Sequence, residues 1–181
     1  MQSCIALGVA FYLAIGAFDA LWALFISDLG ASQLYIGVTL SLFTLPMILV
    51  APFAGRYASQ HNILRLLTKS LGLAVIMIAS YAFIESIWWI CLPLVIHALA
   101  DAVSMPATQL AVGKASGESA LSAGQGLFGA IGLIVAAVAS LGGGYLYQSA
   151  GAATVWLTVA SAMIVCLAFA YWRGRGVLEP T

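Results

Sequence analysis

Long apolar stretches alternate with short polar joints along the whole chain. The six stretches span approximately residues 4–26, 34–53, 66–84, 87–112, 120–147 and 153–172. Each is close to the roughly 20 residues that an α-helix needs to cross a bilayer. Barrel strands would instead alternate apolar and polar residues over about 10 positions. The pattern therefore predicts an all-α membrane protein, with six transmembrane helices in a bundle over residues 1–172 and a short tail over residues 173–181.

Composition supports a chain that is surrounded by lipid. Of its 181 residues, 64% are hydrophobic and 7% are charged, whereas soluble domains are roughly 45–50% apolar and about 25% charged. A soluble fold of this length could not bury so much apolar surface. The formal net charge is zero, without a dense basic cluster, so we expect the lipid bilayer and no nucleic acid as a partner.

Basic residues occur only at alternate joints. They are Arg56, Arg65, Lys69, Lys114, Arg173 and Arg175. These positions lie in or beside the second joint, the fourth joint and the tail, while the first, third and fifth joints have none. Lys and Arg near span ends stay preferentially in the cytoplasm. We therefore expect a multi-pass protein of the inner (cytoplasmic) membrane, with cytoplasmic N- and C-termini and a cytoplasmic tail.

Asp19 is a charged residue well inside the first span. It shares one helical face with Tyr12, Gly16 and Ala23, through spacings of three and four residues. This face is more polar than the rest of the helix, so we expect it to look into the protein. A charge at membrane depth costs roughly 2.5–3.5 kcal/mol and is a functional candidate by default. Asp19 is predicted to bind a proton or a cationic substrate; alternatively, it is hydrogen-bonded to a neighbouring helix or reaches the outer interface.

His97 and Asp101 form a second polar site, in the fourth span. They are four residues apart and hence on one helical face, which Ser104 and Thr108 continue. A buried His–Asp pair can exchange a proton near neutral pH. The alternative is a structural pair that locks two helices, with Asp101 partly hydrated near the cytoplasmic interface. The complete set of candidates for substrate binding or proton coupling is Asp19, Tyr12, Trp22, His97 and Asp101.

Small residues recur every four positions in the fifth span. They are Gly132, Ala136, Ser140 and Gly144, and we call them the small-residue ridge. Such a ridge allows another helix to approach closely, because packing drives helix association in lipid. We predict that it is a helix-packing surface.

The sequence shows no signature of an enzyme or a metal site. It lacks the nucleophile-elbow, zinc-protease and phosphate-loop motifs. Its three cysteines, Cys4, Cys91 and Cys166, are far apart, unlike metal or redox pairs. We therefore expect no enzymatic activity, no metal and no cofactor.

The stretch 18–56 resembles the first two helices of a six-helix half of the major facilitator superfamily. It contains F-D-A-L-W-A-L-F-I-S-D-L-G-A-S-Q-L-Y-I-G, then S-L-F-T-L-P and A-P-F-A-G-R. That family places a Gly-x-x-x-Asp-Arg-x-Gly-Arg-Arg type gating loop between the second and third helices. Gly55 matches its first glycine and is followed by Arg56, but Ser59 stands where the aspartate belongs. The loop is thus a degenerate form of the family motif.

The rest of the chain is similar to the C-terminal half of such transporters. A-G-Q-G-L-F-G-A-I-G and L-G-G-G-Y-L-Y resemble the eleventh helix, and P-A-T-Q resembles the tenth. The resemblance implies half of a twelve-helix bundle that performs proton-coupled secondary transport of a small solute, with efflux as one form. In that arrangement the first and fourth spans line the cavity, with Asp19 and His97 facing it and Asp101 tuning His97. The second and fifth spans pack against the other half.

The resemblance also implies a partner, because this superfamily builds its transporters from two six-helix halves. The second half would be a separate chain, a missing N-terminal half or a second copy of this chain. The alternative is a non-transporting membrane subunit, or a truncated fragment that only packs against partner helices.

Overall fold

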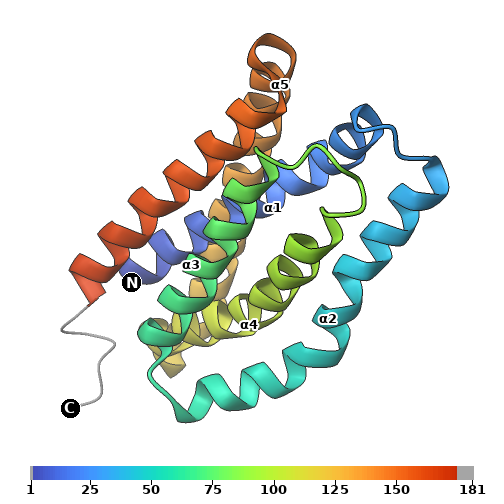
Figure 1. Ribbon diagram of the computed structural model, residues 1–181. Coiled ribbons are helices and arrows are strands. Elements are labelled where there is room, and N and C mark those ends of the chain that lie inside the picture. Colours follow the sequence, from blue (N-terminus) through green and yellow to red (C-terminus); the bar gives the residue numbers. More distant parts are fainter. Residues whose placement is uncertain (1, 175–181) are drawn as a thin grey trace.

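The computed structural model describes residues 2–174, which form an all-helical bundle without strands (Figure 1). The elements are α1 (Gln2–Asp28), α2 (Gln33–Gln60), α3 (Ile63–Tyr81), α4 (Cys91–Ser116), the short 3₁₀-helix η1 (Glu118–Ala120) and α5 (Leu121–Gly174). Each α-helix is long and apolar enough to cross a membrane. The predicted class, a helical membrane bundle, is therefore confirmed. Arg175 and all of the expected tail after Gly174 lie outside the described residues.

The described residues contain five long helices rather than the predicted six, and the difference arises in α5. This helix has 54 residues, which would measure about 80 Å if it were straight. Gly151, with φ 84° and ψ 169°, interrupts the helical backbone in a region that glycine adopts without steric cost. The chain reverses there (Figure 1). The arms 121–150 and 152–174 correspond to the fifth and sixth predicted stretches, and they are joined at the non-helical residue Gly151.

Helix α1 lies at the centre of the bundle and α2 at its edge. α1 packs mainly against α5, while α4 packs against α2 and α3. The largest fully buried side chains include Trp22, Trp156 and Tyr81. α2 is the least buried long helix, and it contains Pro46 and Pro52 inside a bent course (Figure 1). The buried polar side chains come from α1, α2, α3 and α4, and most of them belong to α4.

Side-chain caps define where α2 and α3 begin. The Tyr35 N–H donates to Ser32 Oγ over 3.3 Å at the start of α2, and the Arg65 N–H donates to Asn62 Oδ1 over 2.9 Å at the start of α3. Each cap satisfies a backbone donor that the first helical turn leaves free. The short connections make consecutive helices antiparallel.

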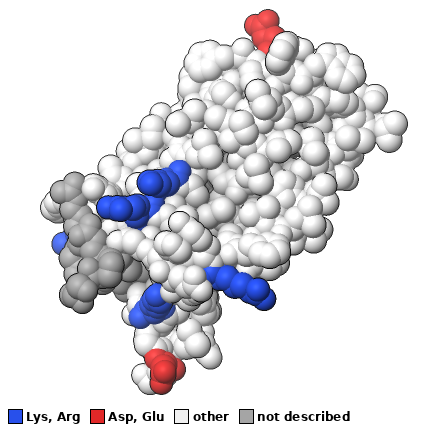
Figure 2. All heavy atoms as spheres, turned by 60° about the horizontal axis from the view of Figure 1, so that its bottom comes forward, with Lys and Arg blue, Asp and Glu red and all other residues white. Residues whose placement is uncertain are grey.

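The described basic side chains gather at one end of the bundle (Figure 2). This end carries the α2–α3 and α4–α5 connections and the last turn of α5, and its residues are Arg56, Arg65, Lys69, Lys114 and Arg173. Asp28, Glu85 and the Gly151 turn lie at the opposite end. The basic side chains thus lie at one end of the bundle, whereas acidic side chains occur at both ends, with Glu118 of η1 at the basic end.

Candidate functional site

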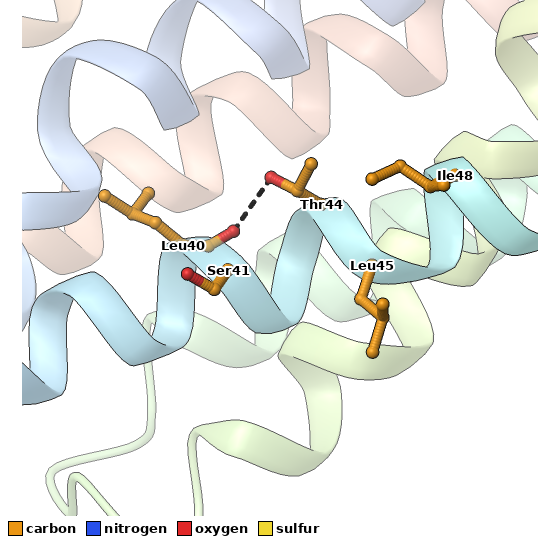
Figure 3. A pocket seen from close by; sticks show the side chains of 5 residues that line it. All are labelled: Leu40, Ser41, Thr44, Leu45 and Ile48. Carbon is orange, nitrogen blue, oxygen red and sulfur yellow. Dashed lines mark hydrogen bonds between the residues drawn. The ribbon is translucent and has the colours of Figure 1, made fainter.

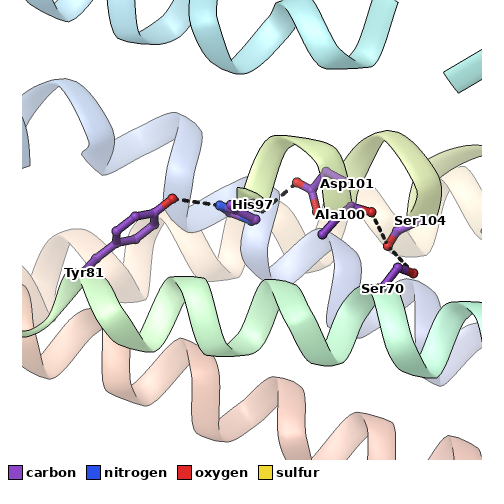
Figure 4. A network of polar contacts seen from close by, with 6 residues as sticks. All are labelled: Ser70, Tyr81, His97, Ala100, Asp101 and Ser104. Carbon is purple, nitrogen blue, oxygen red and sulfur yellow. Dashed lines mark hydrogen bonds and ion pairs between the residues drawn. The ribbon is translucent and has the colours of Figure 1, made fainter. Parts of the chain in front are cut away.

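A chain of buried polar side chains joins α3 to α4 (Figure 4). The Tyr81 hydroxyl lies 3.1 Å from His97 Nδ1, and His97 Nε2 lies 3.5 Å from Asp101 Oδ2. His97 is 0% exposed and Asp101 is 3% exposed. The structure therefore brings two of the predicted residues together in the protein interior and adds Tyr81, which was not predicted.

The same face of α4 continues with hydroxyl groups. Ser104 Oγ lies 2.9 Å from both Ser70 Oγ and the Ala100 carbonyl oxygen, and Thr108 Oγ1 donates to the Ser104 carbonyl over 2.6 Å. Ser70 belongs to α3, so this contact is a second polar link between α3 and α4. The buried face thus runs from His97 to Thr108.

Two atoms of the His–Asp pair still have free hydrogen-bonding capacity. Within residues 2–174, neither His97 Nε2 nor Asp101 Oδ1 has a hydrogen-bond partner. The 3.5 Å separation of the pair is longer than an ordinary hydrogen bond. A buried polar atom without a partner costs about 1–3 kcal/mol, so both atoms destabilise the folded state unless a further group binds them.

Aromatic rings surround the His97 imidazole. The ring centroids of Phe18 and Phe43 lie 5.8 and 5.3 Å from it, each with an edge-to-face orientation. Trp22 stacks on Phe18 at 4.7 Å and donates its indole N–H to Thr39 Oγ1 over 3.0 Å. These contacts connect α1 and α2 to the polar pair and keep its surroundings apolar.

Asp19 lies beside this cluster but on the surface of the bundle. It is nine residues before Asp28 at the end of α1, and Asp101 is ten residues after Cys91 at the start of α4. Both carboxyl groups are therefore about 14–15 Å from the same end of the bundle. Asp19 is nevertheless exposed, whereas Asp101 is buried.

The polar face of α1 does not look into the protein along its whole length. Tyr12 is half-buried and Gly16 is buried, but Asp19 and Ala23 are exposed. The first arm of α5 covers the N-terminal part of this face and leaves the later part open. The sequence indicates which residues share this face, but it does not indicate which of them a neighbouring helix covers.

The small-residue ridge of α5 packs largely against α1 of the same chain. Gly132 lies under the Tyr12 ring, Ala136 contacts Gly16 through its backbone, and Ser140 Oγ donates to the Gly16 carbonyl over 2.8 Å. The fourth ridge residue, Gly144, has no described atom within 4 Å of an added Cβ. The ridge therefore positions α1, and through it Asp19.

The residues of the degenerate gating motif lie in the last turns of α2 rather than in a loop. A Cβ added to Gly55 would be 3.6 Å from Pro106 of α4, so α2 and α4 approach closely here. Ser59 Oγ donates to the Arg56 carbonyl over 2.7 Å. Arg56 is exposed and forms no ion pair within residues 2–174. Its charge is thus free for a group outside these residues.

A shallow groove on α2 is a weaker candidate (Figure 3). It has a volume of about 360 Å³ and is lined by Leu40, Ser41, Thr44, Leu45 and Ile48. Both hydroxyl groups donate to carbonyls of α2 itself, Thr44 to Leu40 and Ser41 to Gly37, over 2.9 Å each. Because no polar groups converge on it from other helices, the groove lacks the composition of a binding site. The described residues also contain no cluster of three metal-ligating side chains.

A bundle of helices that are each long and apolar enough to cross a membrane defines a multi-pass membrane protein. The family model of the Major Facilitator Superfamily matches residues 4–180. The chain therefore belongs to this superfamily of membrane transporters, and the resemblance seen in the sequence is confirmed. Because members of this family are transporters, membership supports the expectation that the chain is not an enzyme. A search of the curated proteins finds no match.

Proposed function

We propose that this chain is one half of a proton-coupled secondary transporter that exports a small solute across the cytoplasmic membrane, with both termini in the cytoplasm. One observation carries the proposal: Asp19 is an exposed carboxyl group about 14 Å inside a membrane-spanning helix. Ionisable residues at this depth face a water-filled cavity or a protein partner rather than lipid. The surface of α1 around Asp19 would therefore border the transport cavity.

The buried pair supplies the second part of the mechanism. A proton that enters from the cavity first meets Asp19, which is exposed, and His97 and Asp101 lie behind it in the bundle. A cationic solute and a proton would compete for Asp19, because each neutralises the same carboxylate.

A second six-helix half would complete the cavity. The exposed strip of α1 around Asp19 includes Ala20, Ala23 and Ser27, which are too small to shield a carboxylate from lipid. The second half would be provided by another chain, by an N-terminal half or by a second copy. Rocking of the two halves about the cavity would then expose Asp19 to each side in turn.

The alternative function is a membrane subunit that packs against partners without transport. The degenerate motif favours it, because Ser59 lacks the carboxylate of the family loop and Arg56 has no ion-pair partner within residues 2–174. This function does not require an ionisable group at position 19. The two proposals therefore predict different effects of Asp19→Asn on transport.

The test uses everted membrane vesicles from cells that naturally make the protein, so that any partner half is present. Respiration establishes a pH gradient, acridine orange reports it, and the amphipathic cation ethidium is the probe. We expect ethidium to dissipate the pH gradient. Asp19→Asn should reduce the initial rate of this dissipation at least tenfold, because a positioned proton-transfer group typically accelerates a reaction by about 10²–10⁴-fold.

Matched variants separate coupling from folding. Asp19→Glu should retain part of the rate, and Asp28→Asn should retain nearly all of it, because Asp28 lies at the end of α1 and only accepts a 2.7 Å hydrogen bond from Tyr147. Unchanged rates in both Asp19→Asn and His97→Ala would remove the coupling role and favour the non-transporting subunit.

A further inference from the structure

Tyr81 is held rigidly beside His97 although nothing in its sequence position marks it as functional. It is the last residue of α3 and is 1% exposed. Its ring lies 5.2 Å from that of Trp22, 5.4 Å from that of Trp156 and 6.4 Å from that of Phe25, measured between centroids. These three rings restrict the phenol to one orientation, in which its hydroxyl group points at the imidazole (Figure 4).

The direction of the Tyr81–His97 hydrogen bond follows from what else the hydroxyl group can reach. Its one hydrogen-bond partner within residues 2–174 is His97 Nδ1, at 3.1 Å. If Nδ1 carried the hydrogen, the buried Tyr81 O–H would have no acceptor, an arrangement that folded proteins avoid. In the other tautomer the Nε2–H forms no hydrogen bond within residues 2–174, but it has a carboxyl oxygen at 3.5 Å, Asp101 Oδ2. The hydroxyl therefore donates to Nδ1. A neutral imidazole carries a single hydrogen, which is then on Nε2, the atom that faces Asp101 Oδ2 at 3.5 Å.

We propose that Tyr81 is a positioning residue that holds His97 in the Nε2–H tautomer, with this hydrogen on the side of the imidazole where Asp101 lies. The inference rests on the proposed function, in which His97 and Asp101 handle the proton, and adds the group that orients them. Phe18 and Phe43 also contact the imidazole, but their edge-to-face rings provide no acceptor or donor for Nδ1. Packing alone would thus leave the ring in place but its tautomer unspecified.

The chain offers a clean spectroscopic test, because it contains only two histidines, His61 and His97. His61 is exposed, so His61→Gln provides a background in which every histidine signal comes from His97. The full chain is labelled with ¹⁵N-histidine, reconstituted in lipid nanodiscs and studied by nitrogen NMR at neutral pH. We expect one species, with a protonated Nε2 and an unprotonated Nδ1 shifted by an accepted hydrogen bond.

Tyr81→Phe removes the hydroxyl group and keeps the ring that packs against Trp22 and Trp156. In this variant we expect the Nδ1 signal to move towards its value without a hydrogen bond, and a second species protonated at Nδ1 to become detectable. Tyr147→Phe is the matched control, because it removes a tyrosine hydrogen bond of 2.7 Å to Asp28, the last residue of α1, and Tyr147 has no hydrogen bond to His97. It should leave both nitrogen signals unchanged.

Two results would overturn the inference, and the first does not require the variant to fold. A wild-type spectrum with the hydrogen on Nδ1 contradicts the proposed donor direction. Identical nitrogen signals in the Tyr81→Phe variant and its parent contradict the positioning role. The transport assay separates this inference from the proposed function. If dissipation of the pH gradient by ethidium depends on Asp19, either NMR result removes only the role of Tyr81. If dissipation does not depend on Asp19, the proposed function fails, whatever the tautomer of His97.

Discussion

At the scale of single residues, two buried tryptophans use their indole N–H groups differently. Trp22 is 0% exposed and donates to Thr39 Oγ1, whereas Trp156 is 1% exposed and its Nε1 has no partner within the described residues. Both rings contact Tyr81 and belong to the same aromatic cluster. Their burial is therefore similar and their hydrogen bonding is not.

This difference predicts unequal costs for the same substitution. Trp22→Phe should lower the free energy of unfolding by about 0.5–1.5 kcal/mol more than Trp156→Phe, because only the first loses a hydrogen bond. The two substitutions remove the same indole volume, so each controls for the loss of packing in the other. Unfolding in mixed detergent micelles, followed by fluorescence, measures the difference. Equal losses would show that the Trp22–Thr39 bond contributes nothing net.

The sequence predicted the polar residues at the candidate site better than it predicted their surroundings. Asp19, His97 and Asp101 are recognisable because an ionisable residue in an apolar stretch is rare. Tyr81 is not, because a tyrosine at the end of a span is also typical of an interfacial anchor. Its role depends on an atom of α4, sixteen residues further along the chain.

At the scale of helices, the α1–α5 contact depends on residues without bulky side chains. An added Cβ at Gly16 would overlap the backbone of Ala136, and the neighbouring Ser140 donates to the Gly16 carbonyl. Such close backbone approach is the usual basis of helix association in lipid. Gly16 therefore determines how closely α1 and the first arm of α5 can pack.

Gly16→Ala should destabilise the protein by about 1–3 kcal/mol, because the helix backbone of α5 must move to accommodate the methyl group. Gly144→Ala is the matched control on α5, where an added Cβ has no described neighbour within 4 Å. There we expect no loss and a gain of at most about 1 kcal/mol from helix propensity. Thermal unfolding in detergent compares the two, and a Gly16→Ala variant as stable as the control would contradict the proposed packing.

Helix positions were largely predictable, but their connections were not. The apolar runs indicate where helices form because burial in lipid demands internal backbone hydrogen bonds over about 20 residues. The fourth helix begins at Cys91, after a turn that includes the exposed Trp88 and Trp89. The fifth and sixth stretches join at Gly151, where a single residue with φ 84° replaces a loop. The hydrophobicity pattern of the sequence does not indicate such local backbone conformations.

At the scale of the whole molecule, the basic end of the bundle predicts its orientation. We expect both termini and the α4–α5 connection in the cytoplasm and the Gly151 turn outside. Single cysteines are introduced by Ser149→Cys and by Glu118→Cys, both at exposed positions, after Cys4, Cys91 and Cys166 are replaced by serine. An impermeant maleimide should label the first variant in intact spheroplasts and the second only after permeabilisation. The reverse pattern would invert the proposed topology.

The sequence by itself determined that the chain spans a membrane, that its basic residues alternate between joints and that it resembles one superfamily. These properties depend on local composition and on the order of residues, which the bilayer acts on directly. Only the tertiary structure decided that Tyr81 meets His97, that Asp101 is buried while Asp19 at similar depth is exposed, and that the small-residue ridge is used within the chain. The physical reason is that the rotation of each helix about its axis is set by packing against its neighbours.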